Sequence, residues 1–245
     1  DGITLKLTDE SSPATIDADS LGQGIRLESP VSLTIEGFTI QRGYLASGRG
    51  GGIYLQNNSD LWLNKVTFKH CTAEGSSPAA NGVGGAVFSL YSNVHADRCR
   101  FIGNSVGSIG WGGAVYGGNW TAVNCVFAFN SADWGGAIEG YWGGNKGDWD
   151  VINCTFFGNS APSGGGAVDG VNTYNSFNSI YWGNIGHNIE GRVFSDYINS
   201  ITIKYSDVQT NSWQEDQGGW QSGTGNISVE PLFIDPAGGD FRMLG

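Results

Sequence analysis

Two carboxylates, Glu139 and Asp169, follow Gly-Gly-Ala-Ile and Gly-Gly-Ala-Val in two consecutive copies of a repeated tetrapeptide. If the copies stack as neighbouring strands of a parallel sheet, their Cα atoms lie roughly 5 Å apart. Glycoside hydrolysis needs such a pair, because one group protonates the leaving oxygen while the other attacks or activates water across about 5 to 9.5 Å. Mutual repulsion separates the pKa values of such pairs, which suits an acid and a base. The sequence therefore predicts catalytic roles for both, with Asp133 as a candidate third carboxylate.

Aromatic residues gather around the same repeats. Those expected to bind substrate are Phe88, Trp111, Tyr116, Trp134, Tyr141, Trp142 and Trp149. Trp111 and Trp134 immediately precede consecutive Gly-Gly-Ala segments. Their flat faces and polar edges suit stacking on sugar rings, and a row of them predicts an extended polysaccharide site. The alternative is that these tryptophans only cover Gly-rich turns and that the two carboxylates are solvated surface residues.

Calcium-dependent lyase chemistry would need an acidic cluster for the metal and a basic side chain near the sugar. Asp148 and Asp150 lie close to Lys146, and Asp17 and Asp19 form another acidic pair. Calcium at either pair would be structural. We expect no required cofactor and no catalytic metal, and we rank a lyase below a hydrolase because the predicted outward rows lack a basic pair.

The elements that must position these residues recur along the chain. Counted at their Phe or Tyr, with Ile40 standing for the first, the repeats are spaced by 28, 33, 26, 29 and 25 residues. The members are Gly37-Phe38-Thr39-Ile40, Val66-Thr67-Phe68, Cys99-Arg100-Phe101, Cys125-Val126-Phe127, Cys154-Thr155-Phe156 and Ser179-Ile180-Tyr181. Gly accounts for 41 of 245 residues and no helical periodicity is present. This period predicts an all-β fold, a right-handed parallel β-helix of about eight turns in a single domain over residues 1–245.

Each coil is expected to contain three strands, one beginning at Gly-Gly-Ala, one of the type Leu61-Trp62-Leu63 and one around Cys-x-Phe. Alternation then assigns the faces. The side chains predicted to enter the core are Val87, Val115, Ile138 and Val168. Those predicted to point outward are Ala86, Ala114, Ala137 and Ala167, with Phe88, Tyr116, Glu139 and Asp169.

Two further columns are expected to be structural. Cys99, Cys125 and Cys154 occupy equivalent places, which predicts a buried stack of thiols, although the rung spacing also permits a disulfide. The second column contains Asn104, Asn130, Asn159 and Asn184. Because Asn accepts left-handed backbone geometry and bonds to nearby backbone, we expect a stacked ladder at a turn.

The formal net charge of -11 argues against nucleic acid and against anionic membrane surfaces as partners. No apolar run approaches the length of about 18 residues expected of a membrane span. The chain starts at Asp1 and contains one Met, so we expect a processed protein or a fragment of a longer one. We also expect a monomer.

The tetrapeptides Gly84-Gly85-Ala86-Val87, Gly112-Gly113-Ala114-Val115, Gly135-Gly136-Ala137-Ile138 and Gly165-Gly166-Ala167-Val168 alternate with Phe101-Ile-Gly-Asn104, Phe127-Ala-Phe-Asn130 and Phe156-Phe-Gly-Asn159. This resembles the paired GGA(I/L/V) and FxxN repeats of the polymorphic outer-membrane protein family, within the wider pectate-lyase-like β-helix superfamily. The ending, residues 225–242, is similar to secreted bacterial β-helix proteins that carry a surface anchor. The resemblance implies the fold. For function it implies either adhesins or carbohydrate-active enzymes, so it does not choose between them.

The leading hypothesis is a secreted or cell-surface protein that binds a neutral or weakly charged polysaccharide along the Gly-Gly-Ala face, with hydrolysis by Glu139 and Asp169. A non-catalytic adhesin or passenger module is the main alternative. A calcium-dependent lyase and a structural spacer are the others.

Overall fold

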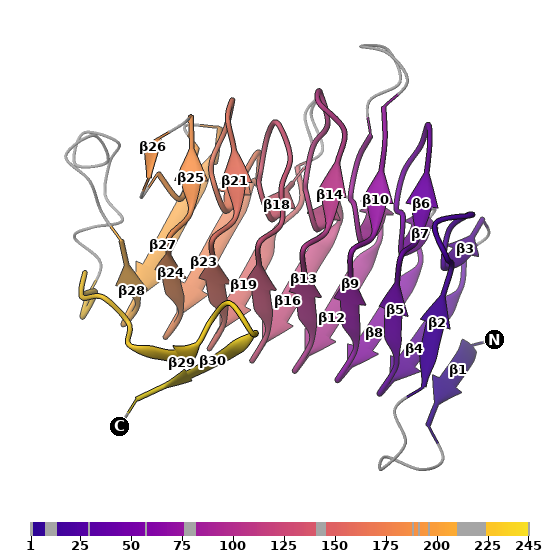
Figure 1. The fold of residues 1–245 in the computed structure, drawn as a ribbon, viewed down its shortest axis with the longest axis horizontal. Coiled ribbons are helices and arrows are strands. Elements are labelled where there is room, and N and C mark those ends of the chain that lie inside the picture. The colour runs from indigo at the N-terminus through magenta and orange to yellow at the C-terminus, as the bar shows by residue number, and fades with distance from the viewer. Residues whose placement is uncertain are drawn as a thin grey trace.

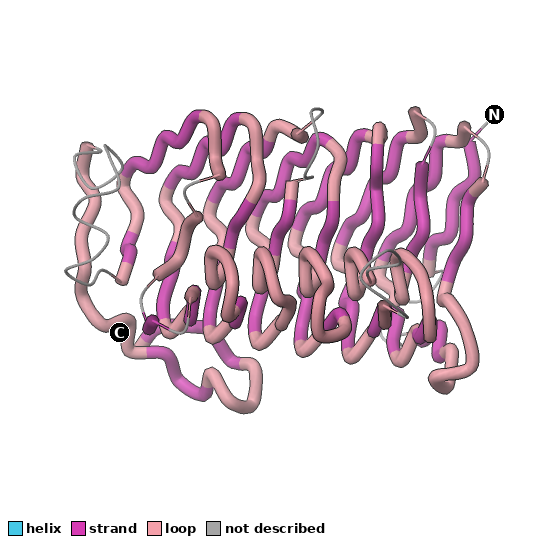
Figure 2. Tube along the Cα trace, turned by 90° about the horizontal axis from the view of Figure 1, so that it is seen from above, coloured by secondary structure: helices cyan, strands magenta, loops and turns pink. Residues whose placement is uncertain are grey.

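The computed structural model describes residues 2–7, 14–28, 30–56, 58–75, 82–140, 146–187, 189–190, 192–195, 197–209 and 224–244. Within these residues the chain forms strands and turns without a helix, and it winds into a parallel β-solenoid of about seven turns (Figure 1). The predicted all-β class is confirmed, and the turn count is close to the eight expected. Seen from above, the coils lie one behind the next along a single axis (Figure 2).

Two eight-stranded parallel sheets run the length of the solenoid. The first, sheet A, contains β1 (Gly2–Lys6), β4 (Ser32–Glu36), β8 (Asp60–Asn64), β12 (Asn93–Asp97), β16 (Asn119–Val123), β19 (Trp149–Ile152), β23 (Thr173–Phe177) and β27 (Ser200–Lys204). The second, sheet B, contains β2 (Thr15–Asp17), β5 (Thr39–Gln41), β9 (Thr67–Lys69), β13 (Arg100–Ile102), β17 (Val126–Ala128), β20 (Thr155–Phe157), β24 (Ile180–Trp182) and β28 (Asp207–Val208).

Sheet C closes each coil. Its six strands are β3 (Ile25–Leu27), β7 (Ile53–Gln56), β11 (Val87–Leu90), β15 (Val115–Tyr116), β18 (Ile138–Glu139) and β22 (Val168–Asp169). Short strands at the corner between sheets B and C are β6 (Tyr44–Leu45), β10 (Thr72–Ala73), β14 (Ser105–Val106), β21 (Ser160–Ala161), β25 (Ile185–Gly186) and β26 (Ile189–Glu190). Sheets A, B and C correspond to the three strand types predicted for each coil.

The core consists of side-chain columns that repeat from turn to turn, because parallel strands in register place equivalent residues above one another. The inward rings of sheet B run from Phe68 to Tyr181, with centroids 4.6–5.0 Å apart and nearly parallel planes. The predicted inward residues of sheet C are fully buried, as expected.

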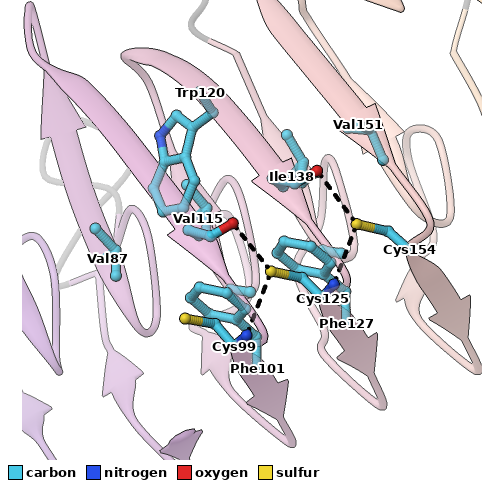
Figure 3. Close-up of a cluster of buried hydrophobic side chains, with 14 of the residues drawn as sticks. Val87, Cys99, Phe101, Val115, Trp120, Cys125, Phe127, Ile138, Val151 and Cys154 are labelled. Atoms are coloured by element: carbon cyan, nitrogen blue, oxygen red, sulfur yellow. Dashed lines mark hydrogen bonds between the residues drawn. The ribbon is translucent and has the colours of Figure 1, made fainter. Parts of the chain in front are cut away.

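The cysteine column is a stack of buried free thiols, which confirms the prediction (Figure 3). The Cys99 amide donates to Cys125 Sγ at 3.4 Å, and the Cys125 amide donates to Cys154 Sγ at 3.3 Å. Burial raises the pKa of the Cys99 and Cys154 thiols well above the ordinary value. The Cys99 and Cys154 thiols therefore stay neutral, and the sulfurs of Cys125 and Cys154 accept backbone hydrogen bonds.

The asparagine column is also confirmed as a ladder. Asn130 Nδ2 donates to Asn159 Oδ1 and to the Phe101 carbonyl, both at 2.9 Å, and Asn130 Oδ1 accepts the Asn104 amide at 3.0 Å. All four side chains are buried. The left-handed geometry belongs to the residue before each asparagine, such as Phe129 with φ 57°, so each amide side chain bonds the backbone of a turn that its neighbour bends.

The C-terminal segment folds back along sheet B as a hairpin of β29 (Phe233–Asp235) and β30 (Asp240–Met243), drawn in yellow in Figure 1. Phe233 and Phe241 pack on Phe157, each with centroids 5.5 Å from it. Arg100 donates to the Gly239 carbonyl at 2.5 Å. The hairpin therefore covers part of the outer face of sheet B.

Candidate functional site

The two predicted catalytic carboxylates are cross-strand neighbours, because Glu139 in β18 pairs with Asp169 in β22. Their predicted exposure is wrong. Glu139 is 2% exposed and Asp169 is 1% exposed. The same correction applies to Phe88 at 1% and Tyr116 at 4%. The outward direction predicted for the four alanines is wrong too, because all four are buried in the main hydrophobic core together with Val87, Val115, Ile138 and Val168.

Glu139 and Asp169 are buried because the Gly-rich turns fold back over the outer side of sheet C. Gly164 lies between Asp169 and Trp134, since a Cβ at this glycine would collide with Asp169 Oδ2 and come within 3.1 Å of Trp134 Cε3. A Cβ at Gly170, where φ is +62°, would collide with Glu139 Oε1. Only glycine permits this close approach, so the repeated glycines cover the carboxylates with backbone.

Asp169 is held by hydrogen bonds inside this cover. Ser195 Oγ donates to Asp169 Oδ1, and the Gly165 amide donates to Asp169 Oδ2 at 3.1 Å. Burial raises the pKa of Asp169 to about 6, even though these donors favour the charged form. A carboxyl with this pKa can exchange a proton near neutral pH, which is chemically suitable for an acid or base.

The acid pair belongs to a column that changes character along the solenoid. In its N-terminal half, Tyr54, Phe88 and Tyr116 stack with ring centroids 5.2 and 5.7 Å apart. Arg26 lies over Tyr54 with its Cζ 4.4 Å from the ring centroid. Phe88 and Tyr116 were predicted to bind sugars, but both rings are buried in this internal stack and expose almost no surface to a ligand.

The two repeat tryptophans lie above this column and remain partly accessible. Trp111 and Trp134 form bridges on successive turns and are half-buried. Trp134 packs against Tyr197 at 5.7 Å and His187 at 6.2 Å between ring centroids, both edge to face. Tyr197 is 40% exposed. We call Trp111, Trp134 and Tyr197 the aromatic line.

Asp133 lies beside the aromatic line and is half-buried. Its Oδ1 accepts a hydrogen bond from Ser163 Oγ at 2.6 Å. This bond joins two successive turns, and it places the carboxylate outside the buried acid pair.

Trp149 is a second correction, because it is fully buried and its ring is not available to bind substrate as predicted. It begins β19, pairs in register with Trp120 and stacks on that ring at 4.9 Å. Tyr141 and Trp142, which were also predicted to bind substrate, lie outside the described residues.

The acidic pairs considered for calcium are bonded to protein groups. Asp17 and Asp19 both contact Arg42, and the hydrogen bond from Arg42 holds the pKa of Asp17 well below its ordinary range. Asp148 Oδ1 accepts bonds from Asn172 Nδ2 and the Thr173 amide. Among the described residues, no group of three or more His, Cys, Asp or Glu side chains is arranged to hold a metal ion.

Sequence reasoning missed Ser195 and Tyr197. Ser195 continues the position of Glu139 and Asp169 on the next coil, where Phe194 bridges to Val168. The signal was hidden because the sequence of this coil reads Gly191-Arg192-Val193-Phe194 in place of Gly-Gly-Ala-Val. An alignment by alternation alone, with Phe194 equivalent to Val168, would have found it.

No family model matches this chain, and neither a curated protein nor a solved structure matches it. The described residues also contain no helix long and apolar enough to cross a membrane.

Proposed function

We propose that this chain is a non-catalytic module of a secreted or cell-surface protein that binds a neutral or weakly charged polysaccharide along its Gly-Gly-Ala face. One observation carries the proposal. The carboxylates Glu139 and Asp169 are 2% and 1% exposed, whereas Tyr197 above them is 40% exposed and Trp111 and Trp134 are partly accessible. Binding groups are open to a polymer while the acid pair is covered.

The spacing of the aromatic line suits a polymer better than a small ligand. Trp111 and Trp134 lie on successive turns, so their positions repeat along the solenoid axis at about 4.8 Å. The edge contacts of Trp134 with Tyr197 and His187 restrict its orientation before any ligand arrives. A restricted ring loses less conformational entropy on binding, which favours a stacking contact with a sugar.

Affinity electrophoresis in gels containing xyloglucan, galactomannan or mixed-linkage β-glucan tests this proposal. The Trp111→Ala/Trp134→Ala variant should bind about tenfold more weakly, since each ring contact contributes about 0.5–1.5 kcal/mol. Phe177→Ala is the matched control, because this ring is 37% exposed on sheet A. If the double variant is retarded as strongly as the wild type in the same gel, the aromatic-line proposal is wrong.

Hydrolysis by the acid pair is the second candidate, favoured by the adjacency of Glu139 and Asp169 and by the pKa of about 6 for Asp169. It would require residues 163–165 to move, because the Gly164 backbone lies between Asp169 and the outer surface at Trp134. Product release in the presence of an intact acid pair would support this candidate.

A further inference from the structure

A row of polar side chains follows the edge of sheet A where each coil passes from sheet C into sheet A. Its members, here called the polar ladder, are Asp60, Asn93, Asn119, Asp148, Asn172 and Asn199. Each is linked to the next by a hydrogen bond of 2.7–3.2 Å, one of them through the Asp148 amide. The ladder therefore runs along the solenoid axis over six successive coils.

The ladder orients its amides but does not use up their hydrogen-bonding capacity. An asparagine side chain offers two N–H donors and accepts at two lone pairs. Asn119 uses one donor on Asn93 and one acceptor on the Asp148 amide. Asn199 uses one donor on Asn172 and one acceptor on Lys146. Counting contacts to the described residues, half of the side-chain hydrogen-bonding capacity of Asn119 and of Asn199 remains, and both residues are exposed.

A hollow of about 430 Å³ lies over the middle of the ladder. Its wall includes Tyr91, Asn119, Lys146, Asn172 and Asn199. This volume falls within the range of about 300–1,000 Å³ that small-molecule sites occupy. Tyr91 is 50% exposed, so it offers an aromatic face beside the oriented amides.

The charges around the hollow favour an uncharged ligand. Lys146 is the only charged residue among the described residues that line it. Its Nζ donates to Asn199 Oδ1 at 3.0 Å and to the Tyr197 carbonyl. The nearby ladder carboxylates, Asp60 and Asp148, and the net charge of -11 would repel a polyanion. Sugar hydroxyls both donate and accept, which matches groups that have one donor and one acceptor left.

We propose that this hollow is a second polysaccharide subsite, which takes a neutral sugar chain laid along the polar ladder with one ring on Tyr91. The ligand class rests on the proposed function, whereas the residues and the face are different. Lys146 joins the two sites, because it bonds both Asn199 of the ladder and the Tyr197 carbonyl in the aromatic line. A polysaccharide bound at the aromatic line can therefore continue past Lys146 onto sheet A.

The test uses Tyr91→Ala and Lys146→Met in the same gels, with alginate as the anionic comparison and Phe177→Ala as control. Each variant should bind the neutral polymer that retards the wild type about fivefold more weakly, the loss expected for one hydrogen bond or ring contact. Alginate should bind weakly or not at all. Thermal melts of each variant that match the wild type establish that folding is intact.

The outcomes separate the two proposals. If both hollow variants bind like the wild type while Trp111→Ala/Trp134→Ala loses binding, the hollow is not a subsite and the aromatic line stands. If the hollow variants lose binding and the tryptophan variant does not, the aromatic line is wrong and the hollow is the main site. If the wild type binds no neutral polymer, both proposals are wrong.

Discussion

Replacing Asp169 by Asn should change how the stability of this protein depends on pH. Burial raises the pKa of Asp169 from 3.8 to about 6, so between these values the folded state holds a proton that the unfolded state has released. The contribution of this group to the free energy of unfolding is therefore fully present below pH 3.8 and is lost as the pH rises from 3.8 to about 6. Two pKa units at 1.36 kcal/mol each give about 3 kcal/mol.

The assay is urea unfolding at several pH values from about 4 to about 7. Asp169→Asn removes the ionisation, so its free energy of unfolding minus that of the wild type should increase by about 3 kcal/mol across this range. Ser195→Ala removes a hydrogen bond that favours the charged carboxylate, and the loss of stability should then occur at higher pH. Asp150→Asn, at an exposed carboxylate, should follow the wild type. A difference between Asp169→Asn and wild type that stays flat or falls with pH would refute the reasoning.

Three further predictions follow from the buried columns. Asn130→Ala leaves buried backbone groups without partners and should lower the free energy of unfolding in urea by about 2–5 kcal/mol. Asn175→Ala, at the surface, should lower it by less than about 0.5 kcal/mol. Equal losses would contradict a stabilising role for the asparagine column. Trp149→Ala should lower the free energy of unfolding by about 3–5 kcal/mol, because this ring is fully buried. Trp62→Ala should lower it much less, because its ring is 47% exposed. The reverse order in thermal melts would place Trp149 outside the core. The four cysteines should resist alkylation at pH 8 in the folded protein and react fully in urea, because burial makes their sulfurs inaccessible to the reagent. Rapid labelling of the native protein would contradict a closed core.

The repeat was readable from the sequence because parallel strands in register place equivalent residues on successive turns. Val87 and Val168 enter the core as alternation predicts, and the pairing of Glu139 with Asp169 follows from the same register. The buried roles of Cys125 and Asn130 were predictable for the same reason. Once the period was known, the pleat placed Val87 inward and Phe88 outward, but it did not predict that Ala86, in the turn before the strand, also packs in the main core.

Alternation does not say whether a second layer covers the side facing away from the core. Phe88 and Asp169 leave the core as predicted, yet the Gly-rich turns lie close enough to bury them. That closeness depends on backbone angles, such as φ of +61° at Gly135, which a single sequence does not reveal. Trp149 was misplaced because an insertion hid its phase, although Trp149-x-Val151 repeats the spacing of Trp120-x-Ala122.

The most direct test of the central claim, binding without catalysis, combines affinity electrophoresis with a reducing-end assay on the same neutral polysaccharides. The wild type and the Glu139→Gln/Asp169→Asn variant are compared. We predict that both are retarded to a similar extent by at least one polymer and that neither releases product. Product formed by the wild type and lost in the variant would contradict this account and would assign the buried carboxylates to hydrolysis.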